Sequence, residues 1–267
     1  MFPVVREFLE LLEEIAPTRL AEPWDNPGLQ VGSYNQEIRK VLLALDPTLK
    51  SLSMARDCGS QLLLTHHPLI FRPFSKLEVD RYPGNVVFEA ANSRISVVTA
   101  HTNLDMAKGG INDILADMLG LQRVSVLKEV NGEVGVGLGR VGDLTQPAPL
   151  SSVVSHIKKI LGAKTLKIVG RGNSLIRRLA VVGGSGGGTV SVAFQKGANL
   201  LLTGDISHHH ALEAEHLGIA LIDGGHFLTE SSAFRHFANP LKDAIKSMGW
   251  NLTVLVDADA INPMQDG

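Results

Sequence analysis

Apolar and polar residues follow one another in short blocks that predict strands alternating with helices. Unbroken apolar runs predict strands at residues 41–45, 61–65, 95–100, 165–169, 179–182, 200–203, 219–222 and 252–256, with a glycine-rich strand at 133–141. Helical spacing and helix-ending glycines predict helices at 4–15, 48–58, 85–92, 109–119, 150–161, 189–195, 208–216 and from 227 onward. We expect Pro240 to break or kink the last helix. This alternation predicts an α/β fold with mainly parallel sheets.

The two halves of the chain share a short pattern at a constant offset of 138 residues. Residues 59–65 align with 197–203, and the same offset pairs the strand at 41–45 with residues 179–183. A helix–glycine–strand signal could recur by chance in α/β proteins, but the aligned positions favour an internal duplication. We therefore expect two related α/β domains, with approximate boundaries at 1–125 plus 236–267 for the first and 126–235 for the second.

Five polar residues lie just beyond three of these apolar runs. They are His66, His67, Asp105, His226 and Glu230. Open α/β sheets keep their chemistry at such strand ends. Three imidazoles and two carboxylates can hold two divalent cations, because a carboxylate can bridge a pair of ions. The sequence therefore predicts a dinuclear metal site at the junction of the two related domains.

The adjacent histidines can serve one site only where the backbone turns. In a regular strand the side chains of His66 and His67 would point to opposite faces, and Pro68 favours an extended His67 at the strand end. His226 and Glu230 are four residues apart and would share one face of a helix. Each pair also has an interpretation without metal. His66 and His67 could be two polar residues of a loop, and His226 and Glu230 could be a pair on the surface of a helix.

His101 lies near one of these five residues in the sequence, and its residue type allows more than one role at the site. It lies four residues before Asp105, which we expect on a loop beyond the strand. The imidazole could be a direct ligand or could orient Asp105 from outside the ligand shell, and we favour the second role. A buried histidine with a satisfied hydrogen bond is the remaining alternative.

The ligand set narrows the choice of metal. Imidazoles and carboxylates without thiolates suit Zn, Mn, Fe, Ni or Mg, and argue against a structural cysteine-rich zinc site. Five ligands for two ions leave positions open for water, which is typical of a catalytic site. Two ions about 3.5–4 Å apart would lower the pKa of a water between them towards ~7. We expect Glu230 to bridge the ions, with Asp105 as the alternative bridge.

Two further motifs are weaker. His208, His209 and His210 could form a substrate or accessory metal site, although a solvated cluster is the simpler interpretation. Residues 183–188 are glycine-rich between a strand and a helix, so they could hold a phosphate or form a flexible turn. They match neither G-x-G-x-x-G nor a Walker loop. A local excess of lysine and arginine in the second half is typical of a solvated face, but could attract a nucleotide triphosphate.

Composition excludes several classes of protein. The 267 residues are 44% hydrophobic and 19% charged with a net charge of −2, as in a folded protein with no strong nucleic-acid signal. No apolar run is long enough to cross a membrane, and the acidic N-terminal helix is unlike a signal or transit peptide. Cys58 is the single cysteine, which fits a reducing cytoplasm.

Five stretches, in order, carry a resemblance to a known family. They are residues 24–32 (Trp-Asp-Asn-Pro-Gly-Leu-Gln-Val-Gly), 65–68 (Thr-His-His-Pro), 101–105 (His-Thr-Asn-Leu-Asp), 203–205 (Thr-Gly-Asp) with the histidines that follow, and 225–230 (Gly-His-Phe-Leu-Thr-Glu). The chain resembles the YbgI-like proteins, the type-2 GTP cyclohydrolase I homologues, also known as the Nif-three-like family. The resemblance implies two related α/β domains, a dinuclear site on His66, His67, Asp105, His226 and Glu230, and a toroidal homohexamer.

The resemblance also implies an activity. The family name implies hydrolytic opening of the guanine ring of GTP with release of formate, by a metal-bound water acting on a nucleotide or cyclic amide. A fold does not fix a substrate, so two alternatives stay open. The first is a two-metal phosphoesterase, and the second is a non-catalytic protein that handles metal or serves as a scaffold. The general acid and any triphosphate contacts are not assignable from the residues.

Overall fold

The computed structural model describes residues 1–130 and 133–264, which divide into two compact units. Unit 1 comprises residues 1–104 and 234–267, and unit 2 comprises residues 105–233. Both boundaries fall inside helices, α4 (Thr102–Met106) and α9 (His226–Ser247). The sequence placed residues 105–125 in the first domain. They belong to unit 2 because helix α5 (Ile111–Met118) packs on two strands of the unit 2 sheet.

Unit 1 contains a five-stranded sheet in the order β1-β4-β3-β2-β11. Its strands are β1 (Gly28–Val31), β2 (Lys40–Ala44), β3 (Leu62–Thr65), β4 (Ser96–Thr99) and β11 (Thr253–Val256). The last four strands are mutually parallel, whereas β1 pairs antiparallel with β4 at the edge. The sequence did not predict β1, because its four residues are half-exposed and form no apolar run.

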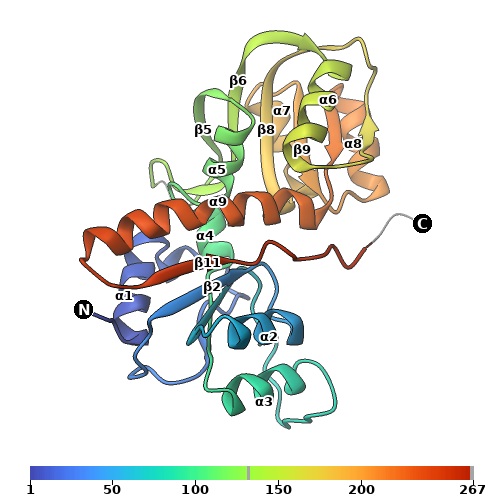
Figure 1. Ribbon diagram of the computed structural model, residues 1–267. Coiled ribbons are helices and arrows are strands. Elements are labelled where there is room, and N and C mark those ends of the chain that lie inside the picture. The colour runs from blue at the N-terminus through green and yellow to red at the C-terminus, as the bar shows by residue number, and fades with distance from the viewer. Residues whose placement is uncertain (131–132, 265–267) are drawn as a thin grey trace. The chain divides into compact units, whose positions relative to one another are not determined.

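Helices cover both faces of this sheet, which is why its inner strands β2, β3 and β4 are buried at nearly every position. They are α1 (Val5–Ile15), the 3₁₀ turn η1 (Thr18–Leu20), α2 (Leu49–Asp57), α3 (Gly84–Asn92) and the part of α9 from Phe234 on. Figure 1 shows α2 and α3 on one face and α9 on the other. The β3 strand is fully buried at all four positions, so whatever follows it starts from a rigid base.

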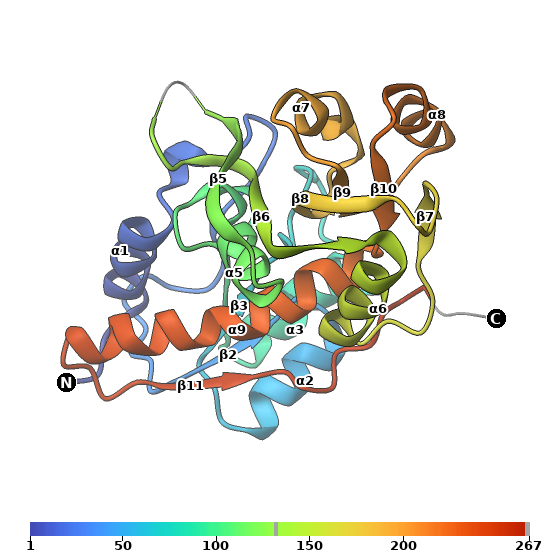
Figure 2. The same ribbon diagram turned by 90° about the horizontal axis from the view of Figure 1, so that it is seen from above.

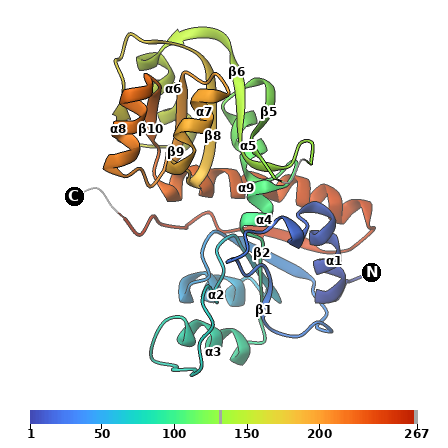
Figure 3. The ribbon, with the colours of Figure 1, turned by 180° about the vertical axis from the view of Figure 1, so that it is seen from behind.

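Unit 2 contains a six-stranded mixed sheet in the order β5-β6-β8-β9-β10-β7. Its strands are β5 (Gln122–Glu129), β6 (Gly137–Pro149), β7 (Lys167–Val169), β8 (Leu175–Ser185), β9 (Leu200–Gly204) and β10 (Ala220–Asp223). Only β8, β9 and β10 are parallel to one another, so the expected mainly parallel sheet is correct for unit 1 and wrong for unit 2. Figure 3 shows β9 and β10 side by side.

The helices of unit 2 lie on both faces of its sheet. They are α5, α6 (Leu150–Leu161), the 3₁₀ turn η2 (Gly187–Thr189), α7 (Val190–Gln195), α8 (His208–Leu217) and the start of α9. Figure 2 shows α7 and α8 on one face of β8, β9 and β10, and α6 on the other. Both faces of these strands are therefore shielded from solvent, which accounts for their continuous apolar sequence.

The same topology and register recur in the two units at the offset seen in the sequence. In unit 1, β2, α2, β3, α3 and β4 follow one another, as β8, α7, β9, α8 and β10 do in unit 2. Val41 pairs with Leu62 in unit 1, and Leu179 pairs with Leu200 in unit 2. Each of the two residues is displaced by the same 138 positions.

Two expectations about helices are wrong. The expected break at Pro240 does not occur: the proline lies inside α9, and the helix continues to Ser247 because Phe237, Leu241 and Ile245 on either side are buried in the core. Asp105 is not on a loop but on the short helix α4. Among the described residues, no helix is both long and apolar enough to cross a membrane.

Candidate metal centre

Three histidines gather at the carboxyl ends of β3 and β4 in unit 1. His66 and His67 follow β3 directly, and His101 lies two residues beyond β4. Their ring centroids are 5.2–5.6 Å apart. A nitrogen of each ring lies within 4.8 Å of the others, close enough for the three to hold a metal ion. Parallel neighbours end at the same edge of a sheet, which is how residues far apart in sequence meet here.

The backbone after β3 turns so that adjacent imidazoles share one side. The N–H groups of His66 and His67 both donate to the carbonyl of Leu45, at 3.2 and 3.0 Å. A regular strand would send these N–H groups in opposite directions. The turn therefore removes the difficulty that two adjacent histidines pose for a single site.

The tautomer of His66 follows from its surroundings. Its Nδ1 lies 2.9 Å from the carbonyl oxygen of Ala100, and a carbonyl oxygen can only accept. Nδ1 must therefore carry the proton, and Nε2 carries the lone pair that a metal ion requires. The ring is fully buried, so this orientation is fixed by packing as well.

Carboxylates hold the other two rings of the cluster in the same way. His67 Nδ1 lies 2.7 Å from Asp46 Oδ1, and His101 Nδ1 lies 2.8 Å from Asp25 Oδ1. An ionised carboxylate only accepts, so Nδ1–H donates in each ring, and in the neutral ring Nε2 carries the lone pair that a metal ion requires. His101 was expected to orient Asp105. Its place in the cluster instead favours the alternative of a direct ligand.

Asp25 is the most strongly perturbed acid of this group. Burial alone would raise the pKa of its carboxyl group, but hydrogen bonds from His101, Thr102 and the N–H of Asn26 lower it to about 2. Asp25 is therefore an anion at neutral pH and keeps its role as an acceptor. Sequence reasoning noted neither Asp25 nor Asp46 as part of a site. Asp46, two residues beyond β2, carries the same strand-end signal that identified His66.

In unit 2, His226 and Glu230 lie on the first turns of α9, as their spacing predicts. His226 Nδ1 lies 2.7 Å from Asp205 Oδ2, and His226 Nε2 lies 3.1 Å from Glu230 Oε2. Both ring nitrogens thus face carboxylate oxygens, which only accept when ionised. A neutral imidazole has one N–H and cannot satisfy both contacts. The arrangement calls for an added proton, on the ring or on Glu230, or for a metal ion shared by His226 and Glu230.

Gly184, at the end of β8, makes room for the Glu230 carboxylate, and Gly183 lies beside the same side chain. A Cβ on Gly184 would lie 2.0 Å from Glu230 Oε1, and a Cβ on Gly183 would lie 3.6 Å from its Cγ. The N–H of Gly183 donates to Asn112 Oδ1 and that of Gly184 donates to Thr229 Oγ1. Both positions are buried in a strand. This part of 183–188 is therefore neither a flexible turn nor a phosphate cradle, because its N–H groups are already engaged.

Asp105 is held close to the same strand end by a buried amide. Asn112 Nδ2 donates to the carbonyl of Asp105 at 2.9 Å while its Oδ1 accepts from Gly183, which lies beside Glu230. The segment between α4 and α5 is held by the buried Arg140, which donates to the carbonyl of Ala107 and pairs with Asp113. The unit 2 residues predicted as ligands thus share one supporting network.

The histidine run at the start of α8 has a structural role at one position. The ring of His210 packs against Gly187, where a Cβ would lie 2.1 Å from His210 Nδ1. That nitrogen also accepts from the N–H of Ser207, and Ser207 Oγ accepts from the N–H of His210, which caps the helix. His208 and His209 contact each other edge to face.

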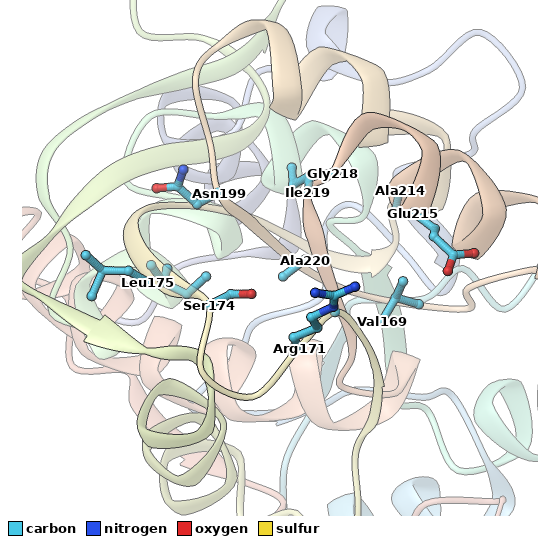
Figure 4. Close-up of a pocket in the computed structure, with 12 residues that line it drawn as sticks. Val169, Arg171, Ser174, Leu175, Asn199, Ala214, Glu215, Gly218, Ile219 and Ala220 are labelled. Atoms are coloured by element: carbon cyan, nitrogen blue, oxygen red, sulfur yellow. The ribbon is translucent and has the colours of Figure 1, made fainter.

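A cavity in unit 2 lies at the other edge of its sheet. Its volume is about 440 Å³, and residues just before β9 and at the start of β10 help to line it. Figure 4 shows Arg171, Ser174, Asn199, Glu215 and Ala220 around it. His226 and Glu230 lie beyond the opposite, carboxyl end of β10, so this cavity is separate from the candidate centre.

The donors present fit divalent transition-metal ions. Imidazole nitrogens with a fixed tautomer, held by carboxylates or a carbonyl behind them, are the usual surroundings of protein zinc, iron or manganese. Buried carboxylates on Asp105 and Glu230 supply the oxygen donors. The side chains in each unit are of the kinds that bind a cation.

Comparison with known proteins gives a consistent family. Residues 3–263 match the sequence model of Duf34/NIF3 (NGG1p interacting factor 3). A Clostridium perfringens protein named GTP cyclohydrolase 1 type 2 homolog is 33% identical over 261 residues, which cover 98% of each chain. A Helicobacter pylori protein named GTP cyclohydrolase 1 type 2 is 35% identical over 262 residues, again 98% of each.

A solved structure agrees with these matches. The crystal structure of a Staphylococcus aureus hypothetical protein superimposes with a TM-score of 0.93 at 28% identity, covering 98% of this chain and 99% of that one. The match in sequence and the match in fold both extend over nearly the whole chain, which confirms the resemblance drawn from the motifs. This chain belongs to the Duf34/NIF3 family.

Proposed function

We propose that this chain binds two divalent metal ions through His66, His67, Asp105, His226 and Glu230, with His101 as a further candidate ligand in the unit 1 cluster. We also propose that it is a metal-dependent hydrolase of a nucleotide or cyclic amide. The observation that carries the proposal is the contact of His226 with Glu230. Asp205 already accepts from the other ring nitrogen, so this 3.1 Å contact needs either an added proton or a shared metal ion, and we assign it to the metal ion. The fixed tautomers of His66 and His67 support the same conclusion.

Divalent ions held by these residues would lower the pKa of a nearby water and polarise the bond under attack. The protein's own groups orient the ligands. Asp46 and Asp205 each hold one ring by its Nδ1, and the carbonyl of Ala100 holds that of His66. The names of the Clostridium perfringens and Helicobacter pylori relatives favour GTP as the first substrate to test.

Two further features belong to this proposal. The identical register at the 138-residue offset supports an internal duplication as the origin of the two units. The homohexamer that the resemblance implies is the second feature of the proposal. Native mass spectrometry measures the number of chains directly, and a monomer at micromolar concentration would contradict the assembly.

Metal content is the first test. Protein purified without chelators should contain about two divalent ions per chain by elemental analysis. Glu230→Gln keeps the shape of the side chain but removes its charge, so it should lose most of this metal while the circular dichroism spectrum is unchanged. Wild-type protein that binds no divalent ion on reconstitution would overturn the ligand assignment.

Product analysis is the second test. Metal-loaded protein is incubated with a panel of nucleotides, and the products are separated. Formate and a fluorescent pterin from GTP support the cyclohydrolase reaction, whereas inorganic phosphate would replace it with phosphoester hydrolysis. Metal-loaded protein that converts none of the panel would overturn the hydrolase proposal and leave a metal-handling protein. Glu230→Gln serves as the control for contaminating activity.

A further inference from the structure

Two exposed aromatic rings lie beside the imidazole cluster of unit 1. Trp24 is 56% exposed and Phe71 is 47% exposed, and their ring centroids are 5.6 Å apart at an interplanar angle of 55°. Single exposed apolar side chains are ordinary on protein surfaces. Two large rings in contact at the rim of a polar site are instead typical of a surface that binds something apolar and flat.

The two rings are attached to a rigid frame. Asn26 Nδ2 donates to the carbonyl of Ile70 at 2.7 Å, and the N–H of Ile70 donates to Gln30 Oε1 at 3.1 Å. Gln30 Nε2 donates back to the carbonyl of Asn26 at 2.7 Å. These bonds tie the segment that carries Trp24 to the segment that carries Phe71. A ligand would therefore meet a surface that is formed beforehand, which lowers the entropy cost of binding.

The aromatic pair is continuous with the candidate metal ligands. The Trp24 ring lies edge to face with His101, with centroids 5.9 Å apart, and His101 lies 5.2 Å from His66. The next residue, Asp25, is the buried anion that orients His101. The backbone that positions the tryptophan thus also positions an imidazole of the cluster. A ring that stacks on Trp24 would lie within reach of whatever cation the imidazoles hold.

We propose that Trp24 and Phe71 form a stacking platform that binds the planar heteroaromatic ring of the substrate, such as a nucleobase, next to the imidazole cluster. Stacking on an aromatic side chain accepts any base, because every base has a π face. The platform therefore selects a class of ring, and the cation beside it would select the position attacked. The assignment of this ring to a substrate rests on the proposed function, but the binding itself does not require metal.

The test uses the small number of tryptophans in the chain. Trp24 and Trp250 are the two tryptophans, so Trp250→Phe leaves Trp24 as the single tryptophan emitter. This variant is titrated, with a chelator present, with guanosine, GTP and ribose 5-phosphate. We expect saturable quenching by guanosine and GTP and none by ribose 5-phosphate, because only the first two carry a ring.

Substitutions then assign the effect to the platform. Trp24→Ala in the otherwise native chain should weaken GTP binding about 5- to 100-fold by calorimetry, as expected for loss of one stacked ring. Trp24→Phe should retain most of the GTP affinity of the wild type. Phe71→Ala should lower the GTP affinity less than Trp24→Ala does. Phe88→Ala removes an equally exposed phenylalanine from α3 and should leave binding unchanged.

Failure of this proposal is distinct from failure of the proposed function. Absence of quenching, or equal binding by Trp24→Ala and the wild type, would overturn the platform while metal content stays as it was. A change in the number of chains per particle on Trp24→Ala, with nucleoside affinity unaltered, would also overturn it, because the rings would then contact another copy of the chain. Metal content lost on Glu230→Gln with the quenching of Trp24 preserved would support both assignments.

Discussion

A single buried amide, that of Asn112, joins the backbone beside two candidate ligands. It donates to the carbonyl of Asp105 and accepts from the N–H of Gly183, which lies against Glu230. Groups that orient metal ligands from behind typically contribute 10- to 100-fold to affinity. Asn112 is not itself a candidate ligand, so its role is to hold the backbone of Asp105 and Gly183 in place.

We predict that Asn112→Ala weakens metal binding about 10- to 100-fold and lowers the free energy of unfolding by about 1–3 kcal/mol for each buried backbone group that loses its partner. Competition with a fluorescent chelator measures the affinity, and urea denaturation measures stability. Asn92→Ala, at the exposed end of α3, is the matched control and should change neither. Native affinity in Asn112→Ala would show that Asp105 holds its position without this bridge.

Asp25 should make the stability of the protein depend on acidity. Its pKa is about 2 in the folded chain and 3.8 in the reference state, so the ionised form favours folding. This stabilisation is complete above the pKa of Asp25 in the unfolded chain. It is lost as the pH falls through the pKa of Asp25 in the folded chain. We predict that Asp25→Asn costs about 2 kcal/mol near pH 7 and that the difference from the wild type shrinks between about pH 4 and pH 2.

Urea denaturation of both proteins across this range measures the difference directly. Asp57→Asn removes an exposed carboxylate from α2 and serves as the control. A difference between wild type and Asp25→Asn that is the same at pH 6 and pH 2 would contradict an ionised, hydrogen-bonded Asp25.

At the scale of elements, the end of β8 shows how a strand accommodates a charged side chain. Gly184 has φ +62°, which disfavours any residue with a Cβ, and that Cβ would also meet the Glu230 carboxylate. Gly188, four residues further on, has open space around its Cα. The two glycines lie in the same segment, but Gly184 alone of the two has a left-handed backbone and lies against Glu230.

We predict that Gly184→Ala lowers the free energy of unfolding by at least about 1–2 kcal/mol, the cost of a left-handed backbone with a Cβ. It should also reduce metal content, because Glu230 must move. Gly188→Ala should leave both properties within error of the wild type. Thermal unfolding and elemental analysis of the two variants give the comparison, and equal behaviour would refute the role assigned to Gly184.

The elements were predictable from sequence where burial alone decides them. The runs at β2, β3 and β9 are apolar at successive positions, so their identity as strands follows from pattern. β1 and β5 were missed because half their positions or more are partly exposed, and pairing along the sheet edge holds them rather than burial. The break expected at Pro240 does not occur, because packing of the residues around it outweighs local propensity.

The candidate site was predictable in its imidazoles and carboxylates but not in their support. His66, His67, His226 and Glu230 stand out by strand-end position or helical spacing. Asp205, Asp46 and Asn112 act through hydrogen bonds to residues 21 or 71 positions away. No periodicity connects such partners, because the fold alone brings them together. A sequence therefore indicates which atoms could bind a cation before it indicates what holds them in place.

At the scale of the whole molecule, a bound cation should stabilise the folded chain. An ion that binds the folded state and not the unfolded one stabilises it by about 2.7 kcal/mol at 100 times its Kd. For a chain of this size each kcal/mol corresponds to about 2–4 °C. The predicted ligands come from both compact units, so we expect the transition of the entire chain to respond.

We predict that Mn²⁺ at such a concentration raises the Tm of chelator-treated wild-type protein by about 5–10 °C, and that Glu230→Gln shows less than half of this rise. Glu215→Gln, on α8 at the cavity far from the candidate ligands of unit 2, is the matched control and should respond as the wild type does. Scanning calorimetry at several ion concentrations separates specific binding from a general salt effect, because only binding follows the logarithm of ion concentration above Kd. An equal rise in all three proteins would mean that the ion acts elsewhere on the chain, and the assignment of Glu230 as a metal ligand would fail.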